Sequence, residues 1–226
     1  MINEFYSTVL SVLNHKQMGK ITPNELNSML SQVLNKNYSE LFSDFRNSTA
    51  KKAKLRDSTN YANENFNLKQ VIEFYIKEET IELIGGKLIV PEDTYLLQSI
   101  FDEKSQYEKV DMKVFNMLTR LQRYNPTECS PIYTFNDNKL KVYPAKEELD
   151  ITYFRKIKPP KWTYEIVGST EVFNADAPDF QDIDMHEMMI GKIFSDFMFM
   201  CGVNLQMQEV QQYAMQLKQE EEINKQ

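Results

Sequence analysis

The sequence Thr-Pro-Asn-Glu at 22–25 marks the best-defined structural boundary in this chain. Threonine is a favoured N-cap, proline costs nothing at the first helical position, and glutamate at the third can reach back to the cap. Apolar residues then recur at helical spacing as far as Phe45. A second apolar stripe covers residues 3–15 and is followed by Gly19. These patterns predict two helices joined by a short link, an αα-hairpin.

The middle of the chain carries two hairpin patterns. Residues 80–84 and 87–90 flank a Gly-Gly pair, a two-residue turn that accepts positive φ. Residues 132–135 and 139–143 flank Asn-Asp-Asn, whose members tolerate the left-handed conformation of a hairpin loop. Helical spacing over 110–121 predicts a helix between the two hairpins.

The sequence of 150–162 predicts a β-strand followed by residues that end it. Residues 150–157 alternate as a pleated strand does, and we expect this strand to join the second hairpin region, as residues 164–167 can. Two prolines at 159–160 remove backbone donors, so a central strand cannot continue through them. The only tryptophan, Trp162, follows directly. The stretch therefore predicts a surface against which other elements or partners pack. Its candidate interface residues are Tyr153, Phe154, Arg155, Lys158 and Trp162.

Two helices are predicted near the end of the chain. The first covers 184–200 and is expected to break at Gly202, and the second covers 205–222. The second becomes wholly polar after Leu217, which is a further candidate interface residue, and we expect this end to order on assembly. The preceding stretch 171–187 carries acidic residues and no Lys or Arg. It is interpreted either as a solvated linker or as an electrostatic edge.

These elements predict an α+β fold in a single domain, 1–226. A mainly helical core would comprise 1–78 and 184–222, with the N-terminal αα-hairpin and the C-terminal helices packed together. A β-rich insert would cover 80–168.

Composition excludes several classes of protein. The net charge is −7, so nucleic-acid wrapping by the whole surface is not expected. Two distant cysteines exclude a disulfide scaffold or zinc ribbon. No transmembrane stretch or signal peptide is recognisable, so no membrane partner is expected. The polar segment 46–65, which is expected to be either a long surface loop or an irregular helix, nevertheless contains a basic cluster. This cluster is interpreted either as a solvated loop or as a contact for DNA phosphate or an acidic partner. Its members are Arg46, Lys51, Lys52, Lys54 and Arg56.

The sequence contains only partial matches to motifs for metal binding or catalysis. Residues 14–25 match a calcium-binding loop in the glycine, isoleucine and glutamate positions, but Asn14, Lys16 and Met18 stand where the first ligands belong. His186 lacks the second histidine of a zinc-protease motif. Cys201 lies among apolar residues and is expected to be packed. We therefore expect no enzyme activity, and we assign no catalytic, cofactor-binding or metal-ligating residue.

The order of these elements resembles the head-to-tail connector proteins (adaptor or neck-ring proteins) of short-tailed bacteriophages, most of all the ring proteins of crAss-like phages. The resemblance rests on Gly-Lys-Ile-Thr-Pro-Asn-Glu at 19–25, Ser-Pro-Ile-Tyr at 130–133, Val-Tyr-Pro at 142–144, the stretch 151–162, the acidic region around Phe180, Gly-Val-Asn-Leu at 202–205 and the Gln-rich end 206–219. The chain departs from this pattern in the long polar segment 46–65 and in Thr-Glu-Cys-Ser-Pro at 127–131.

The resemblance implies a structural virion protein made in the bacterial cytoplasm and placed in the neck or tail region. It would form a homo-oligomeric ring, expected to be a dodecamer, that seals the DNA channel. Its implied partners are other copies of itself, the portal protein, the neighbouring tail ring or hub, and packaged DNA. The alternative is a cytosolic binding or regulatory module that uses the basic segment 46–56 on nucleic acid or a protein partner.

Overall fold

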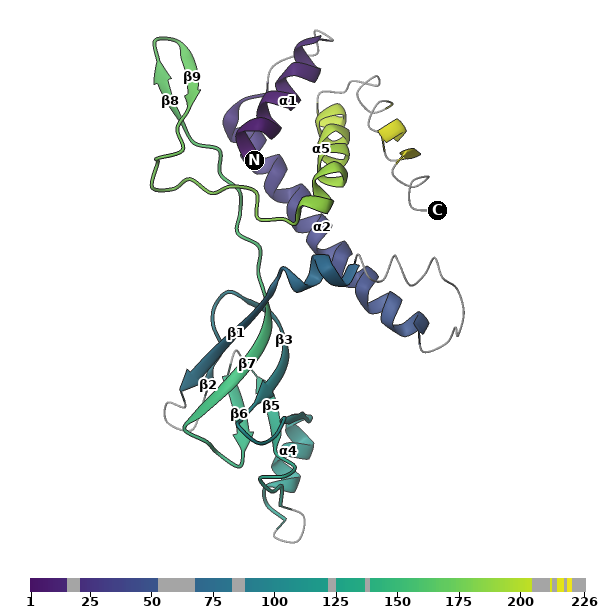
Figure 1. The fold of residues 1–226 in the computed structure, drawn as a ribbon, viewed down its shortest axis with the longest axis vertical. Coiled ribbons are helices and arrows are strands. Elements are labelled where there is room, and N and C mark those ends of the chain that lie inside the picture. Colours follow the sequence, from purple (N-terminus) through teal and green to yellow (C-terminus); the bar gives the residue numbers. More distant parts are fainter. Residues whose placement is uncertain are drawn as a thin grey trace. The chain divides into compact units, whose positions relative to one another are not determined.

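The computed structural model describes residues 1–15, 21–52, 68–82, 88–121, 125–136 and 139–204, together with the helical positions 212, 215–217 and 219–220. The fold mixes helices and strands, as expected (Figure 1). The chain forms two compact units. Unit 1 contains Met1–Phe74 and Ile157–Gln226, and unit 2 contains Tyr75–Lys156. The sequence predicted an insert over 80–168, whereas the compact middle unit begins at Tyr75 and ends at Lys156.

Unit 1 begins with the helices α1 (Ile2–His15) and α2 (Pro23–Lys52). The predicted capping box is confirmed at the start of α2. The Thr22 backbone N–H donates to Glu25 Oε2 at 2.9 Å, and the Glu25 N–H donates to Thr22 Oγ1 at 3.4 Å. The hydrogen bonds that the Glu25 carboxylate accepts from the Thr22 N–H and hydroxyl lower its pKa. The reciprocal bonds satisfy backbone donors that a helix start leaves open.

The end of α2 lies further along the chain than the apolar stripe predicts. The stripe ends at Phe45, but the helix continues to Lys52. Helix geometry needs only residues without strong breakers, and 46–52 contains neither Gly nor Pro. The first part of the polar segment 46–65 is therefore helical, and its residues 53–65 lie outside the described part of the chain.

The C-terminal half of unit 1 contributes a short 3₁₀ helix, η1 (Glu187–Met189), and α5 (Ile190–Asn204). The predicted break at Gly202 is wrong, because α5 runs through this glycine. Glycine costs a helix about 1 kcal/mol relative to alanine, and burial of apolar neighbours such as Phe197, Met198 and Cys201 offsets that cost. The predicted last helix, 205–222, falls mostly outside the described residues, and its described positions are helical.

The core of unit 1 lies between α1, α2 and α5. Each helix turns fully buried side chains inward, and rings from α1 and α5 meet edge to face. The centroids of Phe5 and Phe197 are 5.3 Å apart, and those of Phe5 and Phe194 are 5.8 Å apart. The buried residues of these helices include Val9, Leu13, Leu26, Leu30, Leu34, Ile193 and Phe197.

A two-stranded hairpin also belongs to unit 1. It consists of β8 (Tyr164–Val167) and β9 (Thr170–Phe173), which pair in antiparallel register. Residues 164–167 were a candidate for the second hairpin region of the middle unit, and this interpretation is wrong. The tight turn at Gly168-Ser169 lets β8 pair with the strand that follows it. Gly168 has φ of 68°, a left-handed conformation that glycine adopts without strain.

Unit 2 is built from two small sheets that share one core (Figure 1). One sheet has the order β1-β7-β3, and the other has the order β2-β6-β5-β4. The helix α4 (Met112–Leu118) packs on β5. The strands are β1 (Ile76–Glu82), β2 (Leu88–Ile89), β3 (Thr94–Phe101), β4 (Glu108–Lys109), β5 (Ile132–Asn136), β6 (Lys139–Tyr143) and β7 (Glu148–Arg155).

The core of unit 2 is formed by inward-facing residues of both sheets. Ile100, Leu140, Ile151 and Tyr153 are completely buried in it. On β7 the inward residues alternate, which is the period-2 pattern of a strand with one face on a core. The two sheets therefore hold each other in place by burying these faces.

One predicted hairpin is confirmed and the other is wrong. β5 and β6 pair in antiparallel register as expected. The strands on either side of Gly85-Gly86 do not pair with each other, because β1 pairs with β7 and β2 pairs with β6. The glycine pair itself lies outside the described residues.

The strand β7 differs from its prediction in both its partners and its position. It lies at the centre of the three-stranded sheet, between β1 and β3, and does not pair with the β5–β6 hairpin. Its pairing ends at Arg155, four residues before Pro159. The prolines therefore remove no hydrogen bond from the sheet, which explains why a strand followed by Pro-Pro can still be central.

Candidate functional site

The six candidate interface residues are divided between the two units. Tyr153, Phe154 and Arg155 belong to unit 2, whereas Lys158, Trp162 and Leu217 belong to unit 1. The three aromatic residues among them, Tyr153, Phe154 and Trp162, are at most 5% exposed. β7 lies in the middle of its sheet, and both of its faces are covered. Its aromatic side chains are therefore buried in the fold. All three aromatic side chains are thus packed within the fold itself.

Trp162 anchors unit 1 from within. Its indole Nε1 donates to Asn3 Oδ1 at 3.1 Å, and its backbone exchanges two hydrogen bonds with the Asn27 side chain, at 2.8 and 3.1 Å. Its ring lies 4.5 Å from that of Tyr6 and stacks on Tyr164 at 5.8 Å. The residue thus connects α1, α2 and the base of the β8–β9 hairpin.

The other candidate residues are more exposed. Arg155 lies over the Tyr75 ring, with 5.5 Å between its guanidinium carbon and the ring centroid. The exposed Lys158 donates its backbone N–H to Asp184 Oδ2 at 3.0 Å. Leu217 is half-buried at a helical position.

The basic cluster is described only in part. Arg46 is exposed on α2. Lys51 and Lys52 lie in the last turn of this helix, where the side chains are outside the described part, as are Lys54 and Arg56 altogether.

The acidic stretch 171–187 supplies hydrogen-bond acceptors to unit 1. Asp182 Oδ1 accepts from the Ile2 backbone N–H at 2.7 Å, and its other oxygen lies 3.3 Å from the N-terminal ammonium group. Asp179 pairs with Lys161, and the hydrogen bond from this lysine lowers the pKa of Asp179. At least part of this stretch is therefore bound to the fold and is not a free linker.

Residues considered for metal chemistry have structural roles where they are described. Glu25, the last position of the calcium-like loop, is occupied by the capping box, while 16–20 lie outside the described residues. His186 Nδ1 accepts from the Met188 N–H at 3.3 Å and caps η1. Burial raises the pKa of the Cys201 thiol to about 12. Across the described ranges, no group of three or more His, Cys, Asp or Glu residues is arranged to hold a metal ion.

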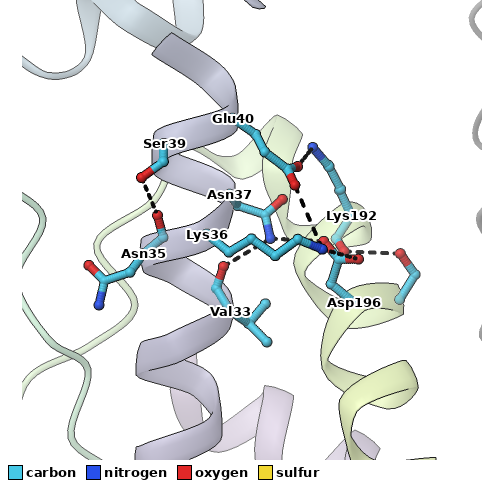
Figure 2. Close-up of polar contacts among 9 residues, drawn as sticks. Val33, Asn35, Lys36, Asn37, Ser39, Glu40, Lys192 and Asp196 are labelled. Atoms are coloured by element: carbon cyan, nitrogen blue, oxygen red, sulfur yellow. Dashed lines mark hydrogen bonds and ion pairs between the residues drawn. The ribbon is translucent and has the colours of Figure 1, made fainter. Parts of the chain in front are cut away.

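A polar cluster joins α2 to α5 inside unit 1 (Figure 2). Asn37 is fully buried, and its Nδ2 donates to Asp196 Oδ2 and to the Val33 carbonyl, both at 3.0 Å. Lys36 Nζ lies 3.7 Å from the second oxygen of Asp196. Nearby, Lys192 Nζ donates to Glu40 Oε2 at 2.8 Å. Each contact links one helix to the other or to itself, so the cluster fixes how α2 and α5 pack.

A second polar cluster lies at the edge of unit 2. The buried Tyr153 hydroxyl is 2.9 Å from Glu79 Oε2 and 3.0 Å from Asp93 Oδ1. Lys77 Nζ lies 3.3 Å from Asp93 and 3.7 Å from Glu79. Burial raises the pKa of Tyr153 to about 12. Burial also opposes ionisation of Asp93, but hydrogen bonds from Tyr153 and Lys77 outweigh it and lower the pKa of that carboxyl. The positive charge of Lys77 therefore offsets the negative charges of Glu79 and Asp93, whose carboxylates both lie beside the Tyr153 hydroxyl.

An open cavity of about 500 Å³ lies on unit 2 near the start of β7. Its lining is strongly charged and includes five acidic side chains and two lysines. Within this lining, the Asp102 carboxylate accepts hydrogen bonds from the backbone N–H groups of Lys104 and Ser105, both at 2.8 Å. Thr80 donates to Asp150 at 2.6 Å. The charged lining residues are Asp102, Glu103, Lys104, Lys146, Glu147, Glu148 and Asp150.

The two most exposed large apolar side chains in the described part of unit 1 lie on the β8–β9 hairpin. Ile166 is 71% exposed and Val167 is 62% exposed, and Val172 on the same hairpin is 47% exposed. This hairpin was not predicted, although Gly-Ser between two short apolar runs is a recognised signal for a two-residue turn. A second exposed group lies on α4 and its last turn in unit 2, where Val114 is 36%, Met117 is 53% and Leu121 is 45% exposed.

The apolar residues of α4 and its last turn differ in exposure. Helical spacing places Val114, Phe115, Leu118 and Leu121 on one side of the predicted helix. Only Phe115 is buried, and the exposed apolar row follows positions 114, 117 and 121 instead. Leu118 is half-buried. Apolar residues occupy most of the circumference of this helix, so the sequence alone does not decide which side faces the core.

None of the helices in the described ranges combines the length and apolar character needed to cross a membrane. Comparison with protein-family models finds no family that matches this chain, and comparison with curated proteins finds no related sequence.

Proposed function

We propose that this protein is a structural subunit of an oligomeric ring in the head-to-tail connector of a short-tailed bacteriophage. The ring would lie between portal and tail, seal the DNA channel and dock the next tail component. The proposal combines the resemblance given by the sequence with a structural observation. That observation is the gathering of exposed apolar side chains on two small elements, one in each unit.

The β8–β9 hairpin gives the strongest structural support for a ring subunit. Large aliphatic side chains on short strands are normally packed on one face, yet Ile166 and Val167 are each more than 60% exposed. These two side chains point to opposite faces of the hairpin, so each face presents an exposed aliphatic residue to a partner. Exposed apolar surface of this kind is typical of interaction sites. A subunit that assembles with copies of itself would cover such residues.

We further propose how the two units divide the work. The helical elements of unit 1 would form the body of the ring subunit, and unit 2 would be a β-rich insert in this helical core. Unit 1 contains both chain ends, so the partners that bind near either end would contact the same body. These partners would be neighbouring copies, the portal protein and the next tail ring, with packaged DNA as a candidate contact for the basic segment 46–56.

Electron microscopy of the purified protein, together with particles that contain it, tests the proposal. Closed rings, or density for the protein at the neck of particles, are the expected result. A protein that stays monomeric at its highest attainable concentration and is absent from particles would contradict it.

The same preparation tests the alternative function. A cytosolic module that uses the basic segment would bind nucleic acid with an affinity that falls steeply as salt rises, because bound phosphates release counterions. Arg46→Glu, at an exposed position of α2, would weaken that binding. Salt-dependent binding by a monomer, reduced in this variant, would favour the module over the ring subunit.

A further inference from the structure

We infer that the β8–β9 hairpin of one copy packs against the exposed apolar row of α4 on a neighbouring copy. This inference rests on the proposed ring function and specifies its subunit contact. The apolar row is defined as Val114, Met117 and Leu121. The occupant of this row is therefore a second copy of the same chain.

The hairpin presents apolar and acidic side chains together. Its register places Glu165 opposite Val172 and Val167 opposite Thr170, so these four side chains share one face. Val167 and Val172 are exposed on it, beside the exposed carboxylate of Glu165. Figure 1 shows the hairpin extending as a two-stranded arm. This face can contact another molecule without opening the unit 1 core.

The apolar row on α4 is continuous. Its members are spaced by three and then four residues, which places them on one side of a helix. The backbone supports this geometry past the end of α4, because the Leu121 N–H donates to the Met117 carbonyl at 3.2 Å. Phe115 points the opposite way, into unit 2, and is 8% exposed. The row is therefore not needed to cover the core beneath the helix.

Charge supports pairing of these two surfaces. The hairpin face that carries Val167 and Val172 also carries Glu165, whereas Lys113 and Arg120 lie beside the apolar row of α4. Lys113 is four residues before Met117 and Arg120 three residues after it, so both cations border its side chain. Apolar contact with an acidic rim on one side and a basic rim on the other favours this orientation over hairpin–hairpin or helix–helix contact.

Two different surfaces on each copy give a head-to-tail contact. Such a heterologous contact leaves one free surface of each kind at the ends of any chain of subunits. Repetition of this contact gives a closed ring when the rotation between neighbours closes, and an open filament when it does not. The exposed hairpin and the exposed α4 row together thus supply the head-to-tail contact that a ring subunit requires.

Complementary variants test this contact. Val167→Asp blocks the hairpin and Met117→Asp blocks α4, and each protein alone is expected to lose the oligomer in sedimentation and native mass spectrometry. A mixture of the two retains one intact pair of surfaces and is expected to form dimers that contain one copy of each. Met188→Asp, at a methionine that is also 53% exposed, serves as the matched control and should assemble as the wild type does. Circular dichroism checks that each variant is folded.

Charge reversal provides a second readout that leaves the apolar residues in place. Copies with Glu165→Lys should assemble poorly with wild-type copies and regain assembly with copies that carry Lys113→Glu and Arg120→Glu. Loss without such recovery would overturn the orientation proposed for this contact.

Cross-linking separates failure of this contact from failure of the proposed function. In a Cys129→Ser background, Val167→Cys copies are mixed with Met117→Cys copies and oxidised, and a disulfide-linked dimer is expected. Rings without this dimer would overturn the hairpin–α4 contact and leave the ring function standing. The dimer without rings would support the contact and contradict the ring. Absence of both would overturn both.

Discussion

Trp162 holds the segment after the middle unit against both N-terminal helices. Its ring packs on Tyr6, and its polar groups bind Asn3 and Asn27. Trp162→Ala removes these contacts and leaves a cavity, so we expect unfolding to become easier by about 3–5 kcal/mol. Chemical denaturation followed by circular dichroism measures this, since the variant has no tryptophan fluorescence.

Trp162→Phe is the matched control for that prediction. It keeps an aromatic ring beside Tyr6 but loses the hydrogen bond to Asn3, so its loss of stability should be smaller. A Trp162→Ala protein with wild-type stability and impaired ring assembly would instead identify Trp162 as an interface residue, against its burial at 3% exposure.

Tyr153 predicts a pH dependence at the alkaline end. Burial raises its pKa in the folded protein to about 12, from an ordinary value of 10.0. A raised folded-state pKa contributes stability that is complete below pH 10.0 and is lost as the pH rises toward about 12, because the unfolded chain loses its proton first. Tyr153→Phe should therefore flatten the fall in unfolding free energy across this window. It should also lower stability at neutral pH by about 1.5–3 kcal/mol, because Glu79 and Asp93 lose their shared donor.

Tyr107 provides the background to this measurement, since burial also raises its pKa to about 12. The alkaline loss of stability should thus be reduced in Tyr153→Phe without disappearing. Tyr95→Phe, at a side chain that is 44% exposed, is the control. An unchanged slope in Tyr153→Phe, or an equal change in Tyr95→Phe, would contradict the assignment.

Helix starts and tight hairpins were predictable because local residues determine them. The capping box at 22–25 and the β5–β6 pairing depend on side chains within a few positions of each other. Pairing between distant strands does not. β1 pairs with β7 across about seventy residues, and nothing near Gly85-Gly86 encodes that choice against a local hairpin. The partner of a strand is decided by which pairing buries the shared core.

The candidate surface was hard to predict for a related reason. Aromatic residues on β7 suggest an interface and a core equally well from sequence, because both environments favour them. Their burial followed from the position of β7 between β1 and β3. By contrast, the Gly-Ser turn at 168–169 was a local signal for the β8–β9 hairpin. The exposure of Ile166 and Val167 could not be read from it, since exposure depends on what the rest of the fold leaves uncovered.

At the scale of the whole molecule, the chain leaves unit 1 and returns to it through neighbouring strands of unit 2. β1 follows Tyr75 directly, and β7 ends at Arg155. The Arg155 N–H donates to the Tyr75 carbonyl at 2.9 Å, and its guanidinium lies over the Tyr75 ring. The two ends of unit 2 are therefore fastened together inside the unit itself. Adjacent ends are typical of a domain inserted into another, because such an insertion leaves the host chain nearly continuous.

This closure predicts that unit 2 folds without unit 1. A protein that comprises Tyr75–Lys156 keeps both sheets, their shared core and the Arg155–Tyr75 contact, so it should show the far-ultraviolet spectrum of a β-rich protein and a cooperative thermal transition. Ile151→Ala within it should lower the transition temperature strongly, since this residue is fully buried in that core, whereas Ile89→Ala, at 62% exposure, should change it little. An isolated unit without a cooperative transition would show that unit 1 is required for its fold, and the middle of the chain would then be a part of one domain.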